Sequence, residues 1–178
     1  LNKTFIGAAL AVSALPLIAV ADDANRLNTR LRTATKATGD FDLAYAGLRK
    51  TAADTGLAFE DSVGTFQSLS RVQEDLGLTT ENVLVLNDTV QKLGIIGGTS
   101  ATALQNGLTQ LNQGFAAGVF RAEEFNSIVE NIPELAARIA DNLGLTQGEL
   151  RKLVLEGEAF SDVIAGSILE VSRDVTTE

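Results

Sequence analysis

Acidic side chains come closest, by type and spacing, to a catalytic arrangement in this chain. Glu123, Glu124 and Glu130 could form a carboxylate pair for general acid and base chemistry, as glycosidases require. Glu123 and Glu124 stand in the first turn after a glycine, where acidic residues stabilise a helix N-terminus through its dipole. Because no partner base is identifiable, we favour a capping role for these acids over a catalytic one.

Histidine and cysteine are both absent from the sequence. Their absence excludes an imidazole base, a thiol nucleophile, a disulfide and a Cys/His metal site. We therefore expect no enzymatic activity, no cofactor and no metal ion.

Gly114 and Gly118 have the GxxxG spacing that lets apolar membrane helices pack closely together. Here the pair lies in a short amphipathic stretch and not in an apolar span. A close helix crossing, or a helix end at Gly118, explains the two glycines better than dimerisation does.

The first twenty-one residues contain an apolar segment, residues 5–20, which is uncharged and has Ser13 as its one hydroxyl-bearing residue. It follows Lys3 and ends in Ala19-Val20-Ala21, a small-x-small pattern, so residues 1–21 read as a secretory signal peptide. The alternative is an internal helix rich in small residues that packs closely or enters a bilayer, although its length makes stable spanning doubtful.

Basic residues follow this apolar segment on the next expected helix. Such an arrangement can favour an anionic membrane surface, but a solvated helix face flanked by Asp22 and Asp23 is the stronger interpretation. The residues are Arg26, Arg30, Arg32 and Lys36.

The rest of the chain is acidic. Residues 1–50 hold seven Lys and Arg against four Asp and Glu, whereas the remainder holds seven against nineteen, and the net charge is -9. An acidic body repels phosphate, so we expect no sequence-specific binding of nucleic acid.

The 178 residues suffice for one domain with an appendage, and the 45% hydrophobic and 21% charged content indicates a folded chain. Only 5% of residues are aromatic and no alternating strand pattern occurs, which favours helices. Methionine is absent, and Leu1 stands first, so we expect either an unusual start codon or a piece of a longer chain.

Glycines punctuate the sequence, and each follows a stretch of helical periodicity, as a left-handed residue after a helix end does. Two of these predicted helix ends, residues 75–79 and 142–146, have nearly identical sequences. After the second of them, Thr146 and Glu149 have the spacing of a capping box at the start of the next helix. The predicted stops are Gly39, Gly56, Gly77, Gly97 with Gly98, Gly118, Gly144 and Gly157.

Between the stops, apolar residues recur at helical spacing and predict core faces. One stripe is Val83, Leu86, Val90 and Leu93, a second is Leu104, Leu108, Leu111 and Phe115, and a third is Phe125, Ile128, Ile132, Leu135, Ile139 and Leu143. The predicted helices are 4–21, 22–37, 41–55, 59–76, 80–96, 99–117, 121–131, 133–143, 147–156 and 161–172. We therefore expect an all-α fold, a compact bundle of about eight to ten short helices with an apolar N-terminal helix.

An ordered set of phrases runs through the second half of the chain. Gly118 is followed by a short basic turn, by residues 124–128 (Glu-Phe-Asn-Ser-Ile) and by Pro133, then by Leu143-Gly144 and by residues 148–153 (Gly-Glu-Leu-Arg-Lys-Leu). With upstream phrases at 59–69, 76–81 and 98–101, this order resembles the tape measure domain of long-tailed phages and prophages. The resemblance extends from Ala21-Asp22 across nearly the whole chain.

The resemblance implies a domain organisation of an apolar helix at 1–21, a basic helix and connector at 22–38, and a helical tape measure domain at 39–178. Because the family carries a small apolar helix directly before the Ala-Asp pair, it favours residues 5–20 as an uncleaved element that can contact the host membrane. Complete family members also have long coiled-coil regions, which this chain lacks. The motif residues, all with structural roles, are Gly118, Glu124, Phe125, Asn126, Ser127, Pro133, Leu143, Gly144, Gly148, Glu149, Leu150 and Gly157.

The implied function is that of a structural tail protein, which occupies the tail tube lumen of the virion, helps to set tail length and leaves when DNA is delivered. The implied partners are the tail tube protein, tail assembly chaperones, tail tip proteins and further copies of the chain. The competing hypothesis is a secreted or periplasmic all-helical interaction module whose signal peptide is 1–21.

Overall fold

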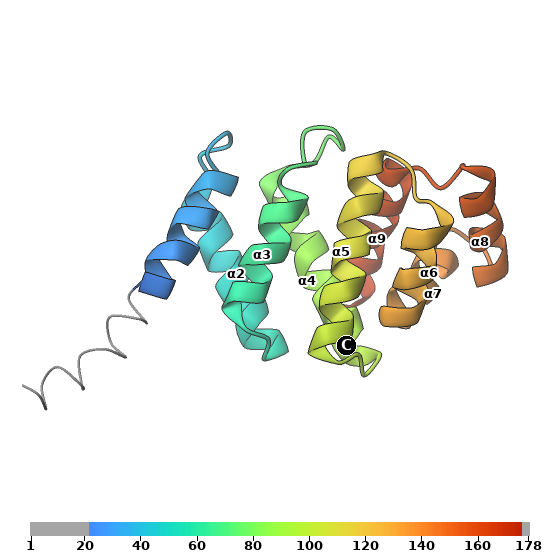
Figure 1. Ribbon diagram of the computed structural model, residues 1–178, viewed down its shortest axis with the longest axis horizontal. Coiled ribbons are helices and arrows are strands. Elements are labelled where there is room, and N and C mark those ends of the chain that lie inside the picture. The colour runs from blue at the N-terminus through green and yellow to red at the C-terminus, as the bar shows by residue number, and fades with distance from the viewer. Residues whose placement is uncertain (1–21, 176–178) are drawn as a thin grey trace, which may run out of the picture.

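The computed structural model describes residues 22–175, and Figure 1 shows this part as helices that stand side by side along the long axis of the molecule. The predicted helix 4–21 lies outside the described residues. A first helical segment, residues 22–34, is followed by α2 (Phe41–Thr55), α3 (Phe59–Leu69), α4 (Thr80–Ile96) and α5 (Ala101–Ala117). The chain continues with α6 (Ala122–Asn131), α7 (Pro133–Asn142), α8 (Gln147–Glu156) and α9 (Ser161–Val175).

The predicted all-α class is confirmed. Within the described part, the sole pairing of strand type is a single antiparallel bridge between Val119 and Phe160. The boundaries predicted for α2, α4 and α8 match the structure to the residue.

The long helix predicted at 59–76 is wrong in its second half, because α3 ends at Leu69 and residues 70–76 form turns. The hydroxyl groups of Ser68 and Ser70 donate to the carbonyl oxygens of Gly64 and Phe66, at 3.1 and 2.8 Å, and so compete for the helix's own acceptors. The next two backbone bonds run from the Arg71 N–H to the Ser68 carbonyl at 3.3 Å and from the Val72 N–H to the Leu69 carbonyl at 3.1 Å, and each spans three residues and no longer four. The predicted helix 22–37 likewise stops early, at residue 34, and turns over residues 35–38.

Helix α4 is the centre of the fold. It packs on α2, α3, α5, α7 and α9, and its most extensive contact is with α9, which lies far away in the sequence. Every residue of the three predicted apolar stripes except Leu143 is buried, and Leu143 is partly buried against the same core. Leu31 from the first helical segment belongs to that core cluster as well.

A polar seam crosses this core between α3 and α4. Ser62 donates to Gln91 Oε1 at 3.0 Å, and Gln91 donates to Asn87 Oδ1 at 2.8 Å, although all three side chains are almost fully buried. A second bond joins Thr51 of α2 to Asp88 of α4 at 2.8 Å. Because buried polar groups cost free energy unless they are paired, these bonds fix the register of α4 against its neighbours.

Candidate functional site

The junction after α5 begins the motif segment, and it is a structural joint. Gly118 ends α5 with a φ of 76°, a left-handed conformation that glycine adopts without strain. Phe120 then packs edge-on against Phe115, with ring centroids 5.3 Å apart. Ser161, at the start of α9, donates its backbone N–H to the Gly118 carbonyl at 3.0 Å and its hydroxyl to the Gly114 carbonyl at 2.8 Å. The joint therefore ties the end of α5 to the beginning of α9.

Glu124 caps α6 with its carboxylate. It occupies the third position of the helix, is buried, and accepts a hydrogen bond from the backbone N–H of Arg121 at 3.1 Å. Glu123 and Glu130 are exposed. The hydrogen bond to Arg121 agrees with the capping role that the sequence favours, because the carboxylate satisfies an N–H that would otherwise lack a partner.

The side chains of Asn126 and Ser127 contact other side chains within α6 and across to α8. The Asn126 Oδ1 accepts a hydrogen bond from Arg151, so it links α6 to α8. Ser127 accepts from the side chain of Asn131, at 2.8 Å on its carbonyl and 3.1 Å on its hydroxyl. The cap position is already filled by Glu124, which leaves both side chains free for these other contacts.

Between α6 and α7, Phe125 is buried on the core side and Pro133 opens α7 in its first turn. A proline is well suited to this position, because the first helical N–H has no intrahelical acceptor. At the other end of α7, the Leu145 N–H donates to the Ala140 carbonyl at 2.9 Å, and the Gly144 N–H donates to the Asp141 carbonyl at 3.0 Å. This pair of bonds is a Schellman motif, with Gly144 left-handed at a φ of 69°.

Helix α8 carries the last motif residues. Glu149 accepts hydrogen bonds from the backbone N–H and the hydroxyl of Thr146, each at 2.8 Å, and these bonds lower the pKa of the Glu149 carboxyl. Leu150 is buried, and Gly157 ends the helix in a left-handed conformation. Gly148 is exposed and has no left-handed φ, and nothing in the structure explains its lack of a side chain.

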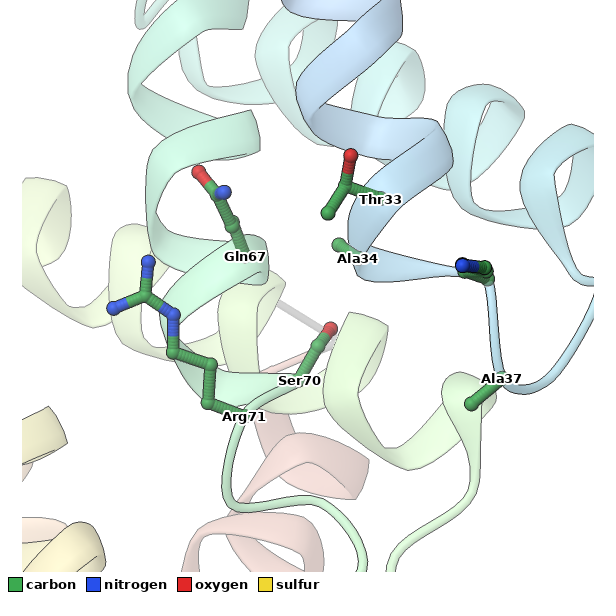
Figure 2. Close-up of a pocket in the computed structure, with 7 residues that line it drawn as sticks. Thr33, Ala34, Ala37, Gln67, Ser70 and Arg71 are labelled. Atoms are coloured by element: carbon green, nitrogen blue, oxygen red, sulfur yellow. The ribbon is translucent and has the colours of Figure 1, made fainter.

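A groove lies between the turn after the first helical segment and the end of α3. It has a volume of about 550 Å³ and is lined by Thr33, Ala34, Lys36, Ala37, Gln67, Ser70 and Arg71. Figure 2 shows Thr33, Ala34 and Ala37 on one side and Gln67 and Ser70 on the other, with Arg71 reaching away from Thr33.

This groove holds no catalytic arrangement. The Thr33 and Ser70 hydroxyls donate to carbonyl oxygens of their own helical segments, at 2.9 and 2.8 Å, so neither is activated by a base. Lys36 and Arg71 stand beside two helix C-termini, where a positive charge offsets the helix dipole. Their placement has a structural reason.

Two further searches cover residues 22–175 alone. In that range no three His, Cys, Asp or Glu side chains gather closely enough to hold a metal ion. Nor does any helix there combine the length and the apolar character needed to cross a membrane. The apolar segment 5–20, for which membrane contact was expected, lies outside the described residues.

These observations define a helical structural protein, in which the motif residues other than Gly148 cap, pack and join helices. The model of the tape measure protein family matches residues 16–178, so the chain belongs to that family. No curated protein and no solved structure matches it. The family is structural and places the chain among the components of phage tails.

Proposed function

We propose that this chain acts during tail assembly as a structural part of a tape measure protein, without catalysing a reaction. The family match, which covers residues 16–178, is the observation that carries the proposal. The motif geometry supports it, because Glu124, Pro133, Gly144 and Glu149 all serve helix starts and ends.

In the proposed function the chain occupies the tail tube lumen, contributes to setting tail length and leaves the tail when DNA is delivered. Its partners there are the tail tube protein, tail assembly chaperones and tail tip proteins, and residues 5–20 contact the host membrane. The apolar character of residues 5–20 and the basic residues that follow them support the membrane contact, since such segments favour an anionic bilayer surface.

A secreted helical module is the second candidate, because Ala19-Val20-Ala21 fits a cleavage site for signal peptidase. The family match argues against it, since the matched region begins at residue 16 and continues across the Ala21-Asp22 bond.

Mass spectrometry of purified virions tests the two candidates together. If the chain is a tail component, its peptides occur in virions, and at least one of them spans Ala21 and Asp22. A chain that is missing from virions, or that begins at Asp22 and accumulates in the periplasm, would overturn the proposal and favour the secreted module.

A further inference from the structure

Aromatic rings and guanidinium groups alternate across α2, from the first helical segment to the start of α3. Tyr45 and the two arginines are exposed, whereas Phe41 and Phe59 are partly buried against the core. We name Arg32, Phe41, Tyr45, Arg49 and Phe59 the basic-aromatic patch. The rings of Phe41 and Tyr45 stack at 6.0 Å, and those of Tyr45 and Phe59 meet edge-on at 5.5 Å. The Arg32 guanidinium lies 4.1 Å from the Phe41 ring centre, and the Arg49 guanidinium lies 5.6 Å from that of Phe59.

This patch has the composition of a protein interaction site. It gathers three of the nine aromatic residues of the chain, including its one tyrosine, on an otherwise acidic molecule. Tyrosine and arginine are enriched among the residues that dominate binding energy at interfaces. In residues 22–175 neither Arg32 nor Arg49 pairs with a carboxylate, so both positive charges remain available to a partner.

A second patch, of opposite charge, lies where α8 passes into α9. We name Leu155, Glu158, Phe160, Asp162 and Val163 the acidic-apolar patch. All five side chains are exposed, and Leu155, Phe160 and Val163 keep 69%, 52% and 45% of their surface open. Large exposed apolar side chains that follow one another closely in the chain favour a docking site.

The backbone holds Phe160 outward. The Ala159 carbonyl accepts from the Phe120 N–H at 2.9 Å, and the Ser161 N–H donates to the Gly118 carbonyl at 3.0 Å. Ala159 and Ser161 are consequently buried, and the residue between them points to the opposite side, as successive residues of an extended chain do. The exposure of Phe160 is therefore fixed by the joint and is not the result of a loose loop.

We propose that copies of this chain associate head to tail, the basic-aromatic patch of one copy docking on the acidic-apolar patch of the next. The two patches are complementary. Each combines apolar side chains with two charged ones, and the charges are positive in the basic-aromatic patch and negative in the acidic-apolar patch. The first helical segment and α8 lie at opposite ends of the long axis, and α3 to α7 stand between α2 and α8 (Figure 1). One molecule therefore cannot close the contact on itself. Because the two surfaces differ, the contact is heterologous and yields a ring or an open chain.

Sedimentation velocity of the full chain at low and high salt tests this contact. The wild type should associate as its concentration rises, and added salt should weaken the association because the charges are exposed. The double variant Arg32→Glu with Arg49→Glu should associate at least tenfold more weakly. The matched control, Lys36→Glu with Arg71→Glu, carries the same change of net charge outside both patches and should associate like the wild type.

A charge swap makes the test specific. Adding Glu158→Arg and Asp162→Arg to the Arg32→Glu, Arg49→Glu variant restores the net charge and exchanges the signs of the two patches, so association should return. The proposal is overturned if the wild type stays monomeric at low salt, if the control weakens as much as the patch variant, or if the swap restores nothing. Association driven by residues 5–20 would ignore every one of these substitutions and would also overturn it. The proposal stands on the two surfaces alone, so it survives even if the chain is absent from virions.

Discussion

Two glutamates of the family motif, Glu124 and Glu149, stabilise the starts of helices. Glu124 and Glu149 each stand three residues after a helix cap and accept the backbone N–H of that cap. The spacing of Thr146 and Glu149 was sufficient to predict this bond from the sequence. The cap Arg121 gave no such signal, because an arginine side chain cannot accept the reciprocal hydrogen bond.

Glu149 gives the fold a dependence on pH. Hydrogen bonds from the Thr146 N–H, and then from its hydroxyl, hold the pKa of this carboxyl below its ordinary value of 4.5. The folded pKa is the lower one, so the stabilisation is complete above the unfolded pKa and is lost as the pH falls through the folded pKa. We expect Glu149→Gln, which keeps a neutral acceptor, to lose less stability on acidification than the wild type does.

Urea unfolding at a series of pH values from neutral to acid measures this difference. Thr146→Ala is the companion variant: it removes the hydroxyl and keeps the backbone donor, so its dependence on pH should fall between the other two. Parallel curves for the wild type and Glu149→Gln through the acid range would contradict the assignment.

Gly114 is required for packing and not for backbone conformation. A Cβ atom at this position would lie 2.3 Å from the nearest ring carbon of Phe120, which is itself buried. Gly114→Ala should therefore destabilise the fold by about 1 to 3 kcal/mol, the usual cost of overpacking a core. Gly166→Ala is the matched control in α9, where a Cβ meets nothing within 4 Å, and it should stabilise by about 1 kcal/mol through helix propensity. Equal midpoints for the two variants in thermal unfolding would show that Phe120 moves aside freely.

At the scale of helices, glycine was the most informative residue type. The predicted left-handed conformation occurs at Gly39, Gly56, Gly77, Gly118, Gly144 and Gly157, and in the Gly97-Gly98 pair it falls on Gly98. The serine hydroxyls that end α3 could not be anticipated, because the same residues are tolerated inside helices when their hydroxyls face solvent.

Gly144 and Gly148 stand four residues apart, but only Gly144 has a backbone conformation that favours glycine. Gly144 is left-handed and closes α7, whereas Gly148 lies in the first turn of α8 with no such requirement. Gly144→Ala should cost about 1 to 2 kcal/mol, since an L-residue is strained in this conformation, and Gly148→Ala should leave stability unchanged or raise it. Thermal unfolding of both variants in one buffer decides the point, and a larger loss from Gly148→Ala would reveal a role that the structure does not explain.

For the whole molecule, the apolar stripes were readable from the sequence, but the pairing of the helices was not. A stripe on α4 indicates that a face is buried, yet it does not say that α9, some seventy residues later, covers it. The joint of Gly114, Phe120 and Ser161 was missed for the same reason, because Ser161 meets Gly114 only after α6, α7 and α8 have folded between them. The buried Asn87 and Gln91 were also missed, since polar residues within a helix are expected on its solvated face.

The compact arrangement of the described helices bears on whether this region could act as a ruler in the proposed setting of tail length. A ruler that measures by contour gains about 1.5 Å per residue as a continuous helix, and 41–172 would then span roughly 200 Å. Here the chain reverses at the glycines that end its helices, and α9 returns to pack on α4. The end-to-end distance of this region therefore does not grow in proportion to its number of residues. We therefore expect this region to serve assembly and not to act as the ruler.

An in-frame deletion of residues 41–172 from the phage gene tests this expectation through the length of the tails that form. A folded module of this size has a radius of gyration of only about 15 Å, so its removal should not shorten tails by its extended length. We expect the deletion to abolish or derange tail assembly, or to leave tails whose change in length is far from 200 Å. A shorter deletion inside the module, of 158–175, should damage assembly comparably, because it removes α9 from the centre of the fold. Electron micrographs that show intact tails shortened in proportion to the residues removed by each deletion would establish that the segment is extended in the tail and is part of the ruler.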